Sequence, residues 1–345
     1  MPKRWIRFTN PVQGELIAWF RSEDAGSLCC GRLHSVAENA LIDFHSQFAD
    51  PFPRIESHGE YILGMFAAPT SVQDKLADFL TIYFLADFEQ IVTVLRSSET
   101  SELPTTRFAI AVVEEQIAKT AELFDGSDWS VGMGIARVAE VFVTQIEQSL
   151  ELFKMNVDSD LKLVTAENFK IASTSDPDYL SELYRRTTAH EREVVSLKTL
   201  LEETKNIFKA VASDEVDIKR TANNENEELF PQSVEVSIAD LLMRARRLTS
   251  VHSNLESGIE FLFRRFQEIE RSQQTAVGRR FTAVVSVLLL PQLIAAYFGQ
   301  NFDETPGYQH DFGWAYSLLL IIVASAVQIV WLKKKKYLWE AIWNF

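Results

Sequence analysis

Amide side chains follow a long uncharged stretch near the C-terminal end of the sequence. Residues 297–302 read YFGQNF, and the amides of this run are Gln300 and Asn301. Neutral amides can hydrogen-bond the water shell of a cation without removing it; Mg²⁺ holds its water tightly, whereas softer ions such as Zn²⁺ lose it more readily. If several copies of the chain close around an axis, these amides form a ring, and Gly299 allows a backbone turn where a Cβ would block it. The run predicts a filter at the entrance of an ion path, formed by Gly299, Gln300 and Asn301.

Three carboxylates follow these amides in the sequence, at Asp303, Glu304 and Asp311. Repeated around a ring, they would concentrate cations in front of it. A second interpretation is purely structural, because a glycine just beyond the last turn is a common way to end a helix. Both interpretations stay open, and the sequence assigns no set of metal ligands.

The sequence carries none of the common signatures of an enzyme. The histidines show no HxxxH or HExxH spacing, there is no GxSxG, and Gly132-Met133-Gly134 lacks the strand and the third glycine of a phosphate loop. Cys29 and Cys30 are adjacent, which indicates reduced cytosolic thiols. We therefore expect a protein that is not an enzyme and that has no cofactor.

Two apolar runs in the last 65 residues are long enough to cross a membrane. Residues 281–298 and 312–332 contain 18 and 21 residues without a charge. A bilayer core of about 30 Å is spanned by about 20 residues at 1.5 Å per helical residue. The alternative is a pair of buried core helices. The flanking sequences favour two transmembrane helices.

The charges around these runs predict their orientation. Arg279 and Arg280 precede the first run and Lys333–Lys336 follow the second, whereas the connection 299–311 has no Lys or Arg. Positive charge stays on the cytoplasmic side, so both termini are expected in the cytoplasm and the short connection outside. The sequence predicts a multi-pass protein of the inner or plasma membrane, with the lipid bilayer as a partner.

The rest of the chain is strongly acidic. The 345 residues include 34 Lys+Arg and 48 Asp+Glu, which gives a net charge of −14. The region after residue 280 is formally neutral, so the excess lies upstream of the apolar runs. Such a surface disfavours nucleic acid and favours cations as partners.

The upstream region divides by pattern into three parts. Residues 1–100 are expected to form a cytoplasmic α/β domain, with strands over 15–20, 61–66, 80–85 and 90–95. Residues 101–232 are expected to be helical over 108–124, 131–155 and 178–212, with a polar turn at 223–228. Residues 233–298 are expected to form one stalk helix that becomes the first transmembrane helix, followed by the loop 299–311, the second transmembrane helix 312–332 and a basic tail 333–345.

The stalk prediction rests on a repeat of large apolar residues every seven positions, at Leu241, Leu248, Leu255, Leu262 and Ile269. The repeat continues into the first apolar run without a proline until Pro291. A helix from 233 to about 297 would be roughly 100 Å long and must pack against other helices. His252 lies in this repeat and is expected to be a buried, hydrogen-bonded histidine. The predicted fold class is an α+β membrane protein.

This arrangement resembles the CorA metal-ion transporter superfamily. The resemblance is carried by the aromatic-Gly-x-Asn-Phe run at 298–302, the acids after it, the two C-terminal apolar runs and the lysines at 333–336. It implies a cytoplasmic α/β domain, a stalk helix that continues into the pore helix, and a homo-oligomer, expected to be a pentamer. Two features depart from the family: Gln300 stands where methionine is usual, as in divergent ZntB-like branches, and Pro291 lies eight rather than nine residues before Gly299. Both put magnesium in doubt as the substrate.

The resemblance also implies that the first transmembrane helix lines an axial pore. Counting back from Asn301 by three or four positions gives Tyr297, Leu290 and Ser286, among others. Alignment on Pro291 gives Leu290, Ser286, Thr282 and Arg279. We expect the pore-lining set to be Tyr297, Leu290, Ser286, Thr282 and Arg279.

The function predicted from the sequence is transport of a divalent cation, Mg²⁺, Zn²⁺ or a related ion, through this pore. A membrane-anchored sensor or scaffold with a vestigial pore is the alternative, motivated by Gln300 and the short Pro–Gly spacing. The direction of transport and any coupling to protons stay open.

Overall fold

The structure of the protein is a computed structural model, and it describes residues 4–9, 15, 52–59, 61–72, 75–97, 104–126, 129–166, 177–222, 225–299 and 312–334. The chain divides into two compact units, Met1–Phe263 and Arg264–Phe345. One helix, α8 (Gln232–Phe298), contributes residues to both units. Each unit is described here by itself.

The first unit contains a five-stranded sheet in the order β1-β5-β4-β3-β2. Its strands are β1 (Arg4–Thr9), β2 (Arg54–Ser57), β3 (Ile62–Val72), β4 (Lys75–Ala86) and β5 (Gln90–Ser97). The pairs β2–β3, β3–β4 and β4–β5 are antiparallel, whereas β1 runs parallel to β5 with Trp5 opposite Ile91. Strands predicted over 61–66, 80–85 and 90–95 are confirmed as parts of β3, β4 and β5. Of the strand predicted over 15–20 only residue 15 is described.

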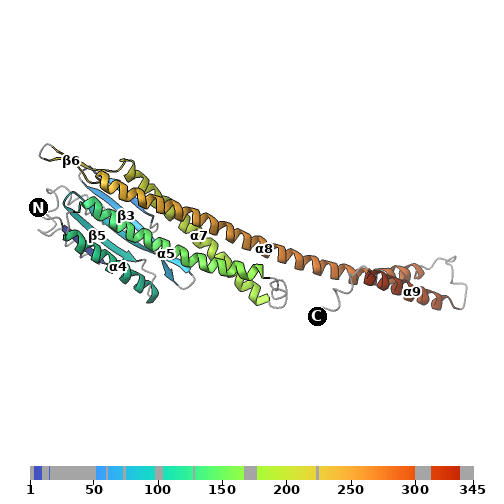
Figure 1. Cartoon of the computed structure of the whole chain (residues 1–345). Coiled ribbons are helices and arrows are strands. Elements are labelled where there is room, and N and C mark those ends of the chain that lie inside the picture. Colours follow the sequence, from blue (N-terminus) through green and yellow to red (C-terminus); the bar gives the residue numbers. More distant parts are fainter. Residues whose placement is uncertain are drawn as a thin grey trace. The chain divides into compact units, whose positions relative to one another are not determined.

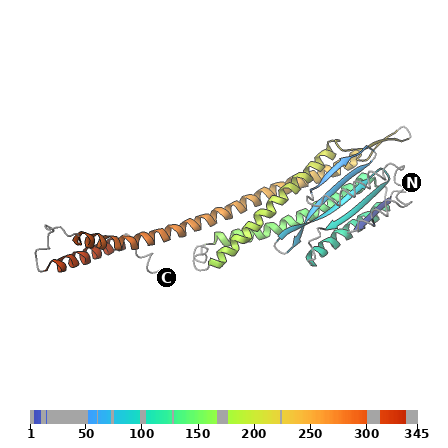
Figure 2. The ribbon, with the colours of Figure 1, turned by 180° about the vertical axis from the view of Figure 1, so that it is seen from behind.

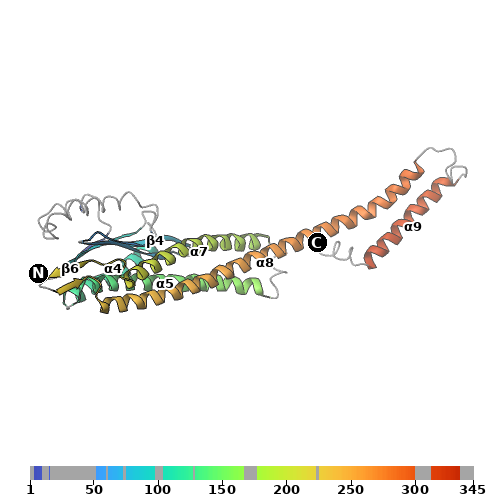
Figure 3. The same ribbon diagram turned by 90° about the horizontal axis from the view of Figure 1, so that it is seen from above.

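Helices α4 (Pro104–Asp125), α5 (Val131–Thr165) and α7 (Pro177–Ala212) contact this sheet. Figures 1 and 2 show the strands and helices of this unit from opposite sides, and Figure 3 shows these helices on one side of the sheet. All three helices were expected from the sequence, and α5 extends ten residues beyond the predicted end at residue 155. Apolar residues recur every three or four positions along these helices, so each helix buries one apolar face against the sheet.

The core of the unit is centred on aromatic side chains from different elements. The ring of Phe66 in β3 lies 5.1 Å from Phe84 of β4, 6.4 Å from Phe142 of α5 and 6.3 Å from Phe208 of α7. Phe84, Phe142 and Phe208 are almost completely buried. The contacts join the sheet to two helices, so these aromatics hold the layers together.

Glycine allows close packing at the start of α5. A Cβ on Gly132 would collide with the backbone carbonyl of Leu229, and a Cβ on Gly134 would lie 2.5 Å from the Ile91 side chain. Gly132-Met133-Gly134 therefore serves helix packing, which agrees with the rejection of a phosphate loop.

The polar turn predicted over 223–228 is wrong at 225–228, the residues of it that the structure describes. Glu225–Glu228 form strand β7, which pairs antiparallel with β6 (Lys219–Ala222). Nζ of Lys219 lies 3.0 Å from a carboxylate oxygen of Glu228, and the guanidinium of Arg220 lies 2.8 Å from a carboxylate oxygen of Glu227. These ion pairs join opposite charges across the two strands, although acidic residues in a row are more typical of a turn.

The first part of α8 packs through the repeat that the sequence predicted. Leu241, Leu248, Leu255 and Leu262 are buried, and His252 is buried with its Nε2 2.7 Å from the carbonyl oxygen of Val194 in α7. The predicted stalk helix over 233–298 is confirmed as α8, which is 67 residues long.

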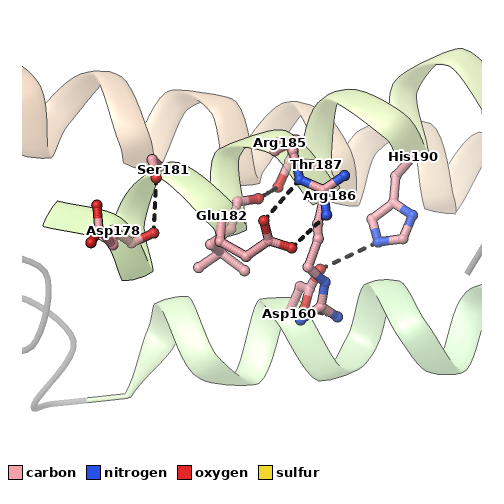
Figure 4. Close-up of polar contacts among 9 residues, drawn as sticks. Asp160, Asp178, Ser181, Glu182, Arg185, Arg186, Thr187 and His190 are labelled. Atoms are coloured by element: carbon pink, nitrogen blue, oxygen red, sulfur yellow. Dashed lines mark hydrogen bonds and ion pairs between the residues drawn. The ribbon is translucent and has the colours of Figure 1, made fainter. Parts of the chain in front are cut away.

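A buried charged cluster joins α5 to α7. Asp160 of α5 is fully buried and lies 2.8 Å from the guanidinium of Arg186 and 3.3 Å from Nε2 of His190, both in α7 (Figure 4). Nδ1 of His190 lies 3.6 Å from Glu193, and the ring of Phe153 covers the imidazole edge at 5.3 Å. Burial lowers the pKa of His190, but the hydrogen bonds and charges of Asp160 and Glu193 outweigh it and raise the pKa to about 9. His190 is therefore an imidazolium at neutral pH.

This cluster predicts a loss of stability in mild alkali. The pKa of His190 is raised above the ordinary value of 6.5, so its contribution is present below pH 6.5 and is lost as the pH rises toward 9. Thermal unfolding of the detergent-solubilised protein from pH 6 to 9 should show this loss, worth about 3 kcal/mol at most.

The variant His190→Gln should be less stable at pH 6 and should lose most of this pH dependence. The exposed His58, which lies 3.6 Å from Glu56, offers a comparison, since His58→Gln should destabilise the protein at pH 6 far less than His190→Gln. An equal pH dependence in wild type and His190→Gln would show that His190 does not change its charge in this range.

Candidate functional site

Two helices of the second unit are long and apolar enough to cross a membrane, by length and composition. The most apolar 18-residue window of α8 has a mean hydropathy of 2.0, and Trp314–Trp331 in α9 (Gly313–Lys334) has a mean hydropathy of 1.9. Only 6% and 0% of these two windows are buried. Core helices of a soluble protein would be mostly covered, so the exposure agrees with candidate membrane spans and not with the alternative of buried core helices.

One side of α8 packs against α9. In the apolar part of α8, the described side chains that are buried or partly buried recur every three or four positions and form what we call the α9-facing stripe: Ala283, Ser286, Val287, Leu290, Pro291, Ile294 and Phe298. Contacts at both ends assign this stripe to α9. Nε2 of Gln328 donates a hydrogen bond to the carbonyl oxygen of Ser286 at 2.6 Å, and the rings of Phe298 and Tyr316 lie 6.2 Å apart.

The other side of α8 is exposed. At 3.6 residues per turn, a second line of residues lies about half a turn away from Ala283, Leu290 and Ile294. We call it the free stripe, and its members are all exposed: Phe281, Val285, Leu288, Gln292 and Ala296. Gln292 is its polar member. Its amide makes no hydrogen bond to any residue that the structure describes.

An exposed amide on a membrane helix has few acceptable environments. The hydrocarbon core cannot hydrogen-bond it, so polar side chains within spans face the interior of a bundle or a water-filled cavity. Gln292 faces away from α9, the other candidate span of this chain. Gln292 therefore needs a polar environment that α9 does not supply, whereas the other four members of the free stripe are apolar.

The described residues contain no group of three or more His, Cys, Asp or Glu side chains that is arranged to hold a metal ion. The groups available along α8 are amide, hydroxyl and backbone carbonyl oxygens. Such neutral ligands suit hard cations and their water shells better than soft ones.

Comparison with known proteins identifies the family. The profile of the CorA-like Mg²⁺ transporter protein family matches residues 37–334. The chain belongs to the CorA-like Mg²⁺ transporter family. The architecture expected from the resemblance, an α/β domain, a long helix and two candidate C-terminal spans, is confirmed.

Curated relatives of this chain align with it over a limited region. The magnesium transport protein CorA of Wolinella succinogenes is 31% identical over 90 residues, which are 26% of this chain and 27% of the relative. CorA of Haemophilus ducreyi is 27% identical over 100 residues, 29% of this chain and 31% of the relative. The chain thus spans about a third or less of these relatives' lengths.

Solved structures share the fold over nearly the whole chain. The CorA magnesium transporter from Methanocaldococcus jannaschii superposes with a TM-score of 0.63 at 13% identity, covering 95% of this chain and 89% of that chain. The full-length CmaX protein gives a TM-score of 0.60 at 14% identity, with 96% and 87% covered. At such identities the likeness concerns the fold.

The pore-lining residues predicted for this CorA-like chain differ in their exposure. Tyr297, Thr282 and Arg279 are exposed, whereas Leu290 and Ser286 belong to the α9-facing stripe. The hydroxyl of Thr282 donates to the carbonyl oxygen of Gly278 in its own helix at 2.8 Å. At 3.6 residues per turn, their spacings of three, four, four and seven positions place all five on one face of α8, which overlaps the α9-facing stripe at Ser286 and Leu290, and their role as a pore lining stays a prediction.

The predicted filter is described only at its first residue. Gly299 follows the last residue of α8, and its N–H donates to the carbonyl oxygen of Ala295 at 2.9 Å. A Cβ there would lie 3.2 Å from that oxygen, a tight contact, and its φ is not in the left-handed region. Gln300, Asn301 and the acids Asp303, Glu304 and Asp311 lie outside the described residues.

Sequence reasoning missed two amides, Gln292 and Gln328. It counted in helical steps from Asn301 and aligned on Pro291, and neither count passes through position 292 or concerns the second apolar run. The sequence did contain a signal for these two residues, because each glutamine interrupts an otherwise apolar run. Polar residues within membrane spans usually have a function.

Proposed function

We propose that this CorA-like protein transports a divalent cation across a membrane, along a path lined by the free stripe of α8. The observation that carries the proposal is the exposed Gln292 on the side of an apolar helix opposite α9. Membership of the CorA-like family and the net charge of −14, which attracts cations, support it. The ion is the substrate, and no cofactor is required.

A path of this kind requires more than one copy of the chain. Two spans cannot enclose a water-filled channel, so the free stripes of several copies would face one another around an axis. A homo-oligomer, a pentamer by resemblance to the family, meets this requirement. The amide of Gln292 would then be repeated around the path, where it can hydrogen-bond a hydrated ion.

The membrane arrangement proposed from the sequence completes this mechanism. The basic flanks of the two spans favour termini in the cytoplasm and the connection 299–311 outside, in an inner or plasma membrane. Gly299, Gln300 and Asn301 then form the entrance, and Asp303, Glu304 and Asp311 attract cations to it. The competing arrangement is a path lined by the set predicted from the sequence, Tyr297, Leu290, Ser286, Thr282 and Arg279.

Asn301 provides a test of the entrance. Asn301→Ala removes an amide from every copy, and it should reduce ion flux into proteoliposomes by roughly tenfold or more, equivalent to about 1.4 kcal/mol. Gln309→Ala removes another amide from the same connection and should leave flux near the wild-type rate. Equal rates for wild type and Asn301→Ala, at matched protein levels, would exclude Asn301 from the entrance.

The same assay decides between transport and the alternative function. The wild-type protein should conduct at least one ion of a panel that includes Mg²⁺ and Zn²⁺, and the ranking would name the substrate. No flux of any divalent ion from a correctly assembled oligomer would favour a membrane-anchored sensor or scaffold.

Gln292 provides a test of the lining of the ion path. Gln292→Leu keeps the size of the side chain and removes its amide, so flux should fall several-fold because the hydrated ion loses hydrogen bonds. Gln292→Asn keeps an amide and should retain more of the flux than Gln292→Leu. A Gln292→Leu protein as active as wild type would remove Gln292 from the path.

A further inference from the structure

Helices α7 and α8 lie side by side in the first unit, and a groove opens between them (Figure 1). The groove has a volume of about 580 Å³, which is within the range of sites that bind small molecules. We call it the basic groove. Its polar lining consists of two lysines of α7, one arginine of α8 and three hydroxyl side chains of α8: Lys205, Lys209, Arg246, Thr249, Ser250 and Ser253. This lining carries three positive charges and no negative charge.

The three cations of the basic groove form no ion pair with any residue that the structure describes. Nη1 of Arg246 contacts Sδ of Met243 in its own helix, at 3.8 Å. Two helical turns before Lys205 the pattern differs, because Nζ of Lys198 lies 3.7 Å from a carboxylate oxygen of Glu256 in α8. The whole chain has a net charge of −14, yet these cations gather without a carboxylate between them. Like charges repel, so this arrangement favours a bound anion.

The position of Lys209 has a second explanation. Lys209 lies in the last turn of α7, where a positive charge interacts favourably with the helix dipole. This explanation does not extend to Lys205, which lies one turn earlier and is half-buried, or to Arg246, which lies in the interior of α8. The helix dipole therefore accounts for one of the three cations.

The hydroxyl groups and the cations together suit the oxygens of phosphate groups. Thr249 and Ser253 donate their hydroxyls to carbonyl oxygens within α8, at 3.0 and 3.2 Å. Ser250 is exposed and makes no hydrogen bond to a described residue, so its hydroxyl can donate to a ligand. A guanidinium matches two oxygens of one phosphate group, and an ammonium supplies charge without a fixed direction. The groove thus offers both charge and directed hydrogen bonds.

We propose that the basic groove is a binding site for a soluble polyphosphate anion, either inorganic triphosphate or the triphosphate group of a nucleotide. Three cations match an anion with several negative charges better than a monovalent one. Residues 254–280 of α8 separate the groove from the first apolar run, which favours a soluble anion over a lipid headgroup. A bound anion would contact both helices and stabilise the first unit. The site is separate from the ion path, so the inference does not depend on transport.

Calorimetric titration of the full chain in detergent tests the proposal. The protein, in about 0.15 M NaCl freed of divalent ions, is titrated with inorganic triphosphate, with ATP and with inorganic phosphate. Triphosphate should bind saturably, one per chain, and about tenfold or more tighter than inorganic phosphate, because it carries more charge. Equal affinities for triphosphate and ATP would assign the recognition to the phosphate groups. Tighter binding of ATP would make a nucleotide the ligand.

Variants locate the site. Arg246→Gln should weaken triphosphate binding by about tenfold or more, and Arg246→Lys, which keeps the charge without the planar fork, should bind with intermediate affinity. Lys205→Gln should weaken binding several-fold. Lys198→Gln is the matched control, because it removes the same charge from α7 at a lysine that is paired with Glu256 outside the groove. Its affinity should stay within about twofold of wild type, because salt screens distant charges.

Three results would overturn the proposal. The first is a wild-type protein that binds no phosphate compound saturably. The second is an equal loss of affinity in Arg246→Gln and Lys198→Gln, which would reflect the overall charge of the chain. The third is a wild-type protein without triphosphate binding whose oligomer dissociates, by light scattering, when Lys205→Gln and Arg246→Gln are combined, because an acidic surface of a second copy would then occupy the groove. Wild-type melting temperatures of the ligand-free variants would show that a lost affinity is not a loss of folding.

Discussion

Every backbone N–H and C=O of a segment within a bilayer must find a partner inside the protein, because lipid offers none. Helix α8 meets this requirement with its own hydrogen bonds and gives one up at Pro291. The region around this break is where α9 makes its polar contact, through Gln328. The packing of α9 there leaves the opposite stripe of α8 uncovered. The position of Gln292, and with it the proposed ion path, depends on this arrangement.

The two halves of α8 bury different fractions of their surface for a physical reason. The leucine repeat of the first half is buried within the Met1–Phe263 unit, whereas the apolar side chains of the second half are mostly exposed. In water such exposure would be costly, at about 25 cal/mol for each Å² of apolar surface. In a bilayer this exposure carries no such cost, so one helix can be stable with its first half in water and its second half in lipid.

Much of the fold could be predicted from the sequence because it depends on local periodicity. Strands β3, β4 and β5 and helices α4, α5, α7 and α8 follow patterns that repeat every two or every three to four residues. Strand β1 was not predicted, because RWIRFT lacks a strict alternation of apolar and polar residues and its partner, β5, lies 86 residues further along the chain. The pairing of β6 with β7 was missed because KRTA and ENEE are short and polar and lack the apolar alternation that indicates a strand. At the candidate site, hydropathy predicted the spans, but the face of α8 that meets α9 depends on a contact between residues 286 and 328, which no local pattern contains.

A cysteine scan of the apolar segment of α8 tests the central claim most directly. Residues 281–298 would be replaced one at a time, in a background carrying Cys29→Ser and Cys30→Ser, and the assembled protein in lipid vesicles would be treated with a water-soluble thiol reagent. The account predicts that reaction rates peak at positions 281, 285, 288, 292 and 296, every three or four residues along the free stripe. Peaks at 283, 286, 290 and 294, or uniform protection of all positions from water, would contradict it.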